Sequence, residues 1–320
     1  MPSFKSVQVH TKSKDFRAAT KIVDIPEVPT PAAGNVVVKN HFLGINATDI
    51  NLTAGAYTGA LPPPFGCGLE AAGIVHAIGE DVTNVKVGDA VAYQKFGAFA
   101  EYVEVHSANL IKTPELSPAI VTMTVGGISA SIALEQIGEM KTNETVFVSA
   151  AAGGTGQYVV QLAKLAGNHV IGTCSSDEKV EHLKKLGCDR VINYTKEDVD
   201  AVLKKEYPKG IDLVFETVVA TLIVFGYISG YHGDKSAEPM LVNQLNPKLL
   251  VKSASVRGFL LHNHGKFIPS HIERLLKLMT EGKLNPGVDS TEFRGLESIP
   301  EAIDYMYERK NIGKLIIKLE

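Results

Sequence analysis

The stretch from Thr145 to Gly156 most constrains what this chain can fold into. It opens with T-V-F-V, a short apolar run rich in β-branched and aromatic residues, which predicts a buried parallel strand. The turn A-A-A-G-G-T-G follows, and Gln157 to Ala166 then carries apolar residues at helical spacing. Such a unit binds a dinucleotide when its pyrophosphate approaches the bare backbone and the helix N-terminus. The residues expected at the pyrophosphate are Gly153, Gly154, Thr155 and Gly156.

A tight turn between two packed elements is the alternative interpretation of these glycines. The residues that follow favour the nucleotide, because strand and helix patterns keep alternating after the turn. That alternation predicts an α/β domain with a doubly wound parallel sheet over residues 122–281. Its further elements are expected as strands at His169 to Thr173, Arg190 to Asn193 and Ile211 to Glu216, with helices at Asp177 to Leu186 and Lys196 to Glu206.

Residues 1–121 have a different pattern. Val36 to His41, Ala72 to Ile78 and Ala90 to Tyr93 are short apolar runs separated by turn glycines. Pro62-Pro63-Pro64 must lie in a loop, because proline neither continues a helix nor donates to a sheet. The pattern predicts a compact β-rich domain, to which residues 282–320 return with the terminal strand Gly313 to Leu319.

Composition narrows the class of partner. The 320 residues are 45% hydrophobic with a net charge of −3, which gives no electrostatic footprint for nucleic acid or an anionic membrane. We expect no apolar run long enough to span a membrane, and Met1 to His10 lacks the apolar core of a signal peptide. Three widely spaced cysteines suit a reducing compartment, so the expected location is the cytoplasm.

The residues after the second strand bear on cofactor choice. An NAD site usually places an acid there to bind the ribose hydroxyl. Here Ser175, Ser176 and Lys179 offer hydroxyls and a cation, which suit the extra phosphate of NADP. Asp177 is the counter-argument, although an acid in the first turn also stabilises a helix. The alternative for Lys179 is an ordinary exposed helix lysine.

Motifs over nearly the whole chain resemble the quinone oxidoreductase branch of the medium-chain dehydrogenase/reductase family. The resemblance implies a GroES-like catalytic domain beside a Rossmann domain. It also implies NADPH-dependent reduction of a carbon–carbon double bond next to a carbonyl, as in the prostaglandin-reducing members of that branch. The motifs are G-I-N-A-T-D (Gly44 to Asp49), G-L-E-A-A-G-I-V (Gly68 to Val75), V-G-D-A-V (Val87 to Val91), G-A-F-A-E-Y (Gly97 to Tyr102) and N-I-G-K (Asn311 to Lys314).

The resemblance also assigns site residues. Hydride transfer to an enone forms an enolate, which a donor near the carbonyl oxygen would stabilise, and water or a tyrosine would protonate the α-carbon. Tyr57 could equally be a packing residue between two glycines. Residues at matching positions are Asn46 and Tyr57 for the substrate pocket, Tyr194 for the cofactor phosphate, Ser129 near the nicotinamide, and Asn311 and Lys314 for the cofactor from the C-terminal segment.

Zinc is not expected. Relatives that bind catalytic zinc carry a cysteine and a histidine where this chain has Asn46 and Leu69, and neither is a usual zinc ligand. Three cysteines also cannot form a four-cysteine structural zinc lobe.

The sequence predicts that one βα crossover is missing after residue 217. Only Thr217 to Thr221 separate Glu216 from the next apolar run, Leu222 to Phe225. Two adjacent parallel strands usually need a dozen or more linking residues, so we expect the second run to be displaced, reversed or merged with the first. The sequence therefore leaves three functions open: an enone reductase, a quinone reductase, or an NADPH-binding protein with little turnover. It also leaves a homodimer open.

Overall fold

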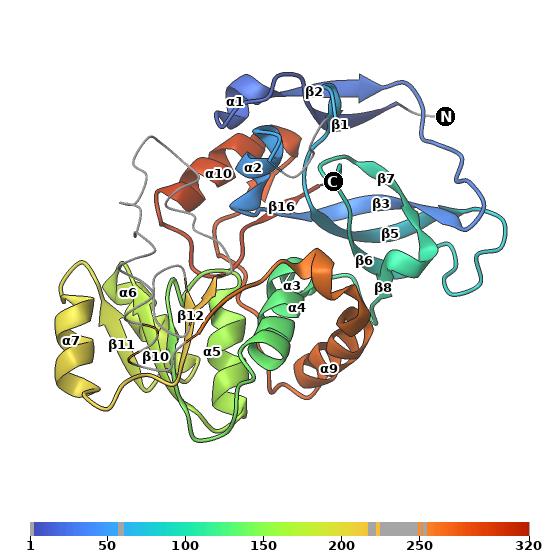
Figure 1. The fold of residues 1–320 in the computed structure, drawn as a ribbon. Helices are drawn as coiled ribbons and strands as arrows, with labels where there is room; N and C mark the ends of the chain where they lie inside the picture. Colours follow the sequence, from blue (N-terminus) through green and yellow to red (C-terminus); the bar gives the residue numbers. More distant parts are fainter. Residues whose placement is uncertain are drawn as a thin grey trace. The chain divides into compact units, whose positions relative to one another are not determined.

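The structure is a computed structural model that describes residues 3–56, 61–216, 222–224, 249, 251 and 255–319. The chain divides into two compact units. Residues 1–125 and 288–320 form the first unit, and residues 126–287 form the second (Figure 1). The segment after residue 287 therefore returns to the N-terminal unit, as its terminal strand predicted.

The first unit is organised around the long strand β3 (Asn35–Gly44). One edge of β3 pairs with β5 (Glu70–Ile78), and the other is shared by β7 (Tyr102–His106) and β16 (Ile316–Lys318), all antiparallel. A small sheet, β2-β1-β4, completes the β structure. The other elements are β1 (Phe4–Val9), α1 (Phe16–Ala19), β2 (Thr20–Ile25), α2 (Thr48–Thr53), β4 (Phe65–Gly66), β6 (Ala90–Gln94), β8 (Leu110–Lys112), α3 (Pro118–Thr122), β15 (Phe293–Arg294) and α10 (Ile299–Tyr307).

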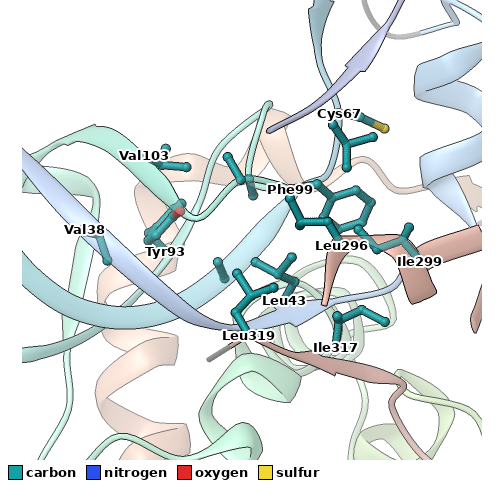
Figure 2. Close-up of a cluster of buried hydrophobic side chains, with 14 of the residues drawn as sticks. Val38, Leu43, Cys67, Tyr93, Phe99, Val103, Leu296, Ile299, Ile317 and Leu319 are labelled. Atoms are coloured by element: carbon teal, nitrogen blue, oxygen red, sulfur yellow. The ribbon is translucent and has the colours of Figure 1, made fainter. Parts of the chain in front are cut away.

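The core of this unit combines side chains from both ends of the chain (Figure 2). Leu43, Phe99 and Ile317 are fully buried and lie within one hydrophobic cluster. Tyr93 is also fully buried, and its hydroxyl donates to Asn40 Oδ1 at 2.8 Å. Because that polar group has a partner, its burial costs little, and the C-terminal segment is an integral part of the fold.

The second unit contains one parallel sheet with the strand order β11-β10-β9-β12-β13-β14. This is the order of a dinucleotide-binding domain. Phe147, Ile171, Ile192 and Val214 come from four adjacent strands and form one buried cluster against a helix. The elements are β9 (Thr145–Val148), α5 (Gly156–Leu165), β10 (His169–Cys174), α6 (Asp177–Lys185), β11 (Arg190–Asn193), α7 (Val199–Glu206), β12 (Leu213–Glu216), β13 (Leu222–Val224), β14 (Val256–Gly258) and α9 (Ile268–Thr280).

The prediction for the strands after Glu216 was wrong. Leu222–Val224 forms β13, which is adjacent and parallel to β12, with Val214 opposite Leu222 and Glu216 opposite Val224. From the end of β12 to the start of β13 the chain therefore travels back by only two residues along the strand and sideways by one strand spacing, about 8 Å in all. Five linking residues reach about 17 Å, so no full-length crossover is needed. The link itself and Phe225 lie outside the described residues.

The expectation about membrane-spanning length also needs correction. Pro118–Ile137 is a 20-residue helical stretch with a mean hydropathy of 1.4, which is long and apolar enough to cross a membrane. In this structure 78% of its most apolar window is buried inside the protein. It includes two π-helical turns, Met123–Gly127 and, at its C-terminal end, Ala133–Ile137. Such burial is typical of a core helix.

Candidate functional site

The glycine turn lies directly after β9, where the sheet order reverses. Ser149 N donates to Phe215 O of β12 at 3.1 Å, and Ala151 N donates to Thr173 O of β10 at 3.0 Å. The turn is therefore fixed to both neighbours of β9 at the carboxyl ends of the strands. Ligands of open α/β sheets bind at this switch point.

Close packing explains why the helix begins with glycine. A Cβ atom at Gly156 would lie 2.5 Å from Ala150 O and 2.8 Å from Ala151 Cα. Gly153 leaves more room, because its Cβ would be 3.2 Å from Ala150 O. The backbone of the turn is thus drawn tightly around the N-terminus of α5, an arrangement that suits a pyrophosphate.

The residues predicted for the NADP phosphate lie together at the ends of β10 and β11. Lys179 Nζ donates to Ser175 Oγ at 3.4 Å, and Ser176 Oγ caps α6 by accepting from Lys179 N at 3.3 Å. Tyr194 N donates to Cys174 O at 3.0 Å, and this tyrosine is 38% exposed. Lys179 itself is only 7% exposed, so it is not an exposed helix lysine, and its role at the phosphate stays a prediction.

A buried polar cluster forms in the first unit around Glu70. This carboxylate is completely buried. Its Oε1 accepts from Asn46 Nδ2 at 2.8 Å and pairs with Lys314 Nζ at 2.5 Å. Its Oε2 accepts from Thr124 Oγ1 and, at 2.9 Å, from Val125 N in a π-helical turn. Four donors balance the burial of this charge.

Both polar atoms of the Asn46 side chain form hydrogen bonds within this cluster. Its Nδ2 donates to Glu70 Oε1 and to Gly44 O at 3.2 Å, and its Oδ1 accepts from Lys314 Nζ at 2.6 Å. Asp49, also fully buried, accepts from Asn46 N at 2.8 Å through Oδ2. Burial raises the pKa of Asp49 to about 8, so this carboxyl is mostly protonated at neutral pH. The sequence interpretation assigned no role to Glu70 or Asp49.

The structure says less about the roles of the remaining predicted residues. Tyr57 lies outside the described residues. Ser129 is in α4 (Ile128–Ile132) and is 1% exposed. Asn311 Nδ2 donates to Gly313 O at 2.9 Å. Asn311 and Lys314 belong to the first unit, whereas the glycine turn and Ser129 belong to the second.

Metal ligands do not gather within the described part of the chain. No group of three or more His, Cys, Asp or Glu side chains there is arranged to hold a metal ion. Asn46, at the position of a zinc ligand in zinc-binding relatives, is instead hydrogen-bonded to an ammonium group. Burial raises the pKa of the neighbouring Cys67 thiol well above its usual range, which disfavours the thiolate that a metal would need.

The fold and the two polar sites define a two-domain, dinucleotide-binding oxidoreductase architecture. Residues 32–115 match the alcohol dehydrogenase GroES-like domain, and residues 154–281 match the zinc-binding dehydrogenase domain. The chain belongs to the medium-chain dehydrogenase/reductase family, in its quinone oxidoreductase branch, as its motifs predicted.

Two curated relatives and one solved structure illustrate this membership. Mouse prostaglandin reductase-3 is 46% identical, over 96% of this chain and 87% of the relative. A probable quinone oxidoreductase of Leishmania amazonensis is 40% identical, over 99% and 98% of the two chains. The quinone oxidoreductase of Pseudomonas syringae superposes with a TM-score of 0.83 at 28% identity, over 98% and 99% of the two chains.

Proposed function

We propose that this protein is an NADPH-dependent oxidoreductase that reduces the carbon–carbon double bond of α,β-unsaturated carbonyls, 15-oxo-prostaglandins among them. The observation that carries the cofactor assignment is the buried Lys179, held beside Ser175 at the end of β10. The substrate class is supported by the 46% identity to a relative named prostaglandin reductase-3. The substrate we propose is therefore a small, hydrophobic carbonyl compound.

NADPH fits the residues of the second unit. The tight turn at Gly156 leaves backbone, without a side chain, at the N-terminus of α5, where a pyrophosphate binds. Lys179 and the hydroxyl of Ser175 suit a 2′-phosphate. A Bacillus subtilis relative, 30% identical over 95% of its length, is named a putative NADP-dependent oxidoreductase. When bound, NADPH supplies the hydride.

The protein would bind and orient the substrate and stabilise charge on its oxygen. Asn46 is a positioning residue in this proposal, because both N–H groups of its amide already have acceptors. It holds the ammonium of Lys314, which also pairs with Glu70. Tyr57 stays a proposed donor of the proton to the α-carbon, with water as the alternative.

The assignment of Lys179 can be tested by cofactor titration. Lys179→Ala should weaken NADPH binding by about 1.5–3 kcal/mol, the usual range for a charge-assisted hydrogen bond, and leave NADH binding nearly unchanged. Lys185→Ala removes the same charge from an exposed position of the same helix and is the matched control. Equal affinity of the parent protein for NADPH and NADH would contradict the assignment.

Zinc independence is a further part of the proposal. Asn46 bonds to an ammonium group, and the side chain at position 69 is a leucine, so the chain offers neither ligand of the catalytic metal. We expect enone reduction to survive chelators and metal analysis to find no stoichiometric zinc. Activity that is lost when a chelator removes zinc, and that returns when zinc is added, would contradict zinc independence.

The decisive experiment is to follow nicotinamide absorbance while the protein and NADPH meet a panel of enones and quinones. Enone reduction with a saturated ketone as product would support the proposal. A preference for quinones would support the second candidate, which the Leishmania amazonensis relative favours by name. Binding without turnover would support the third candidate, an NADPH-binding protein with little turnover.

The sequence also supports a proposal about the cellular location and the partners of the enzyme. We propose a cytoplasmic enzyme without nucleic-acid or membrane partners, because the net charge is −3 and the three cysteines are free thiols. A homodimer is compatible with β14, which is the edge strand of the sheet within the described part of the chain and so offers its backbone groups for pairing with a partner. Light scattering on the purified protein would measure the subunit number.

A further inference from the structure

We propose that Asn193, assisted by Lys196, sets the choice of NADPH over NADH by holding the carboxylate of Asp177 away from the cofactor ribose. This inference rests on the proposed NADPH-dependent function and concerns the same site. It assigns a role to two residues at the end of β11 that touch Asp177 rather than the phosphate.

Asp177 is the acid closest to the position that defines an NAD site. It is the first residue of α6, directly after the cap residue Ser176, and lies about 20 residues after the glycine turn. A free carboxylate there would accept from the ribose 2′-hydroxyl of NADH. It would also repel a 2′-phosphate through like charge. A preference for NADPH therefore requires that other side chains of the protein already bind this carboxylate.

Asn193 occupies one of its oxygens. Asn193 Nδ2 donates to Asp177 Oδ1 at 3.0 Å, and Asn193 is only 4% exposed. The amide cannot be turned around, because its Oδ1 accepts from Thr195 N at 3.1 Å and from Thr195 Oγ1 at 2.7 Å. Thr195 thus fixes which end of the amide faces the acid.

Lys196 occupies the other oxygen. Its Nζ forms an ion pair with Asp177 Oδ2. The hydrogen bonds from Lys196 and Asn193 lower the pKa of Asp177, so the acid stays ionised and paired at neutral pH. Both partners of the ion pair are more than half exposed, at 61% and 68% of their side chains. Salt screens such a pair, so Asn193 is expected to contribute more than Lys196.

Asn193→Leu tests the inference, since it removes the donor and keeps the number and branching of the side-chain heavy atoms. The readout is the ratio of the dissociation constants of NADH and NADPH, from titrations followed by nicotinamide fluorescence. We expect this ratio to fall on the order of tenfold, because the released carboxylate repels the phosphate and accepts from the ribose. Lys196→Ala should give a smaller fall that disappears at high salt, and Lys185→Ala should give none.

Asp177→Asn provides the second arm. Alone it should leave NADPH binding nearly unchanged, and combined with Asn193→Leu it should restore the ratio of the parent protein. Thermal unfolding of each variant identifies any loss of folding. An unchanged ratio in folded Asn193→Leu, or a lowered ratio that Asp177→Asn does not restore, would overturn the inference. A parent protein that binds neither cofactor, or both equally, would instead refute the proposed function.

Discussion

Replacing Lys314 by methionine is expected to lower the free energy of unfolding by about 3–5 kcal/mol. The side chains of Lys314 and Glu70 are 6% and 0% exposed, and their charged atoms lie 2.5 Å apart. Methionine keeps most of the volume of lysine but removes the ammonium. Glu70 would then remain buried as a carboxylate without its cation, and Asn46 Oδ1 would lose its donor.

Urea unfolding of the parent and variant proteins measures this loss. Lys318→Met is the matched control, because Lys318 lies four residues after Lys314, at the end of β16, and is exposed; we expect a change below about 0.5 kcal/mol. The Glu70→Gln/Lys314→Met double variant should be less destabilised than the sum of the single variants, because it leaves no unpaired charge. Additive effects, or a Lys314→Met variant as stable as the control, would show that the pair contributes little.

The parallel sheet was predictable because its signal is local. Each of β9, β10, β11 and β12 is a short apolar run, and a helical pattern follows each of the first three. The placement of β13 was not predictable in this way. Register decided it: Val214 lies opposite Leu222, so the chain has to return by only two residues. A sequence shows the length of a link but not the stagger of the strands that it joins.

The candidate site was predictable to different degrees in its two halves. Ser175 and Lys179 follow a strand end, and local sequence therefore places them together. Glu70 was missed because its partners come from distant segments, Lys314 near the C-terminus and Val125 in a π-helical turn. One acid in the apolar run G-L-E-A-A-G-I-V is the only sequence signal. It indicates burial, but it cannot identify the cation.

Gly156→Ala is expected to weaken NADPH binding by at least about tenfold and to destabilise the second unit by about 1–3 kcal/mol, the usual cost of overpacking. The added Cβ would lie 2.5 Å from Ala150 O and 2.8 Å from Ala151 Cα. Both are backbone atoms that cannot rotate away. Ala150 has a φ of +44°, and Ala151 N donates to Thr173 O. Relief therefore requires α5 to move away from the turn, which would displace the N–H groups that bind the pyrophosphate.

Fluorescence titration with NADPH and thermal unfolding together separate the two effects of this substitution. Gly265→Ala is the control, because Gly265 is in the same unit and its Cβ would meet no atom within 4 Å. If the turn contacts the cofactor, NADPH should raise the thermal stability of Gly156→Ala by less than it raises that of the parent protein. This difference is separate from the loss of stability that the variant shows without ligand. If Gly156→Ala were destabilised but still bound NADPH like the control, the turn would serve only helix packing, which is the alternative interpretation of its glycines.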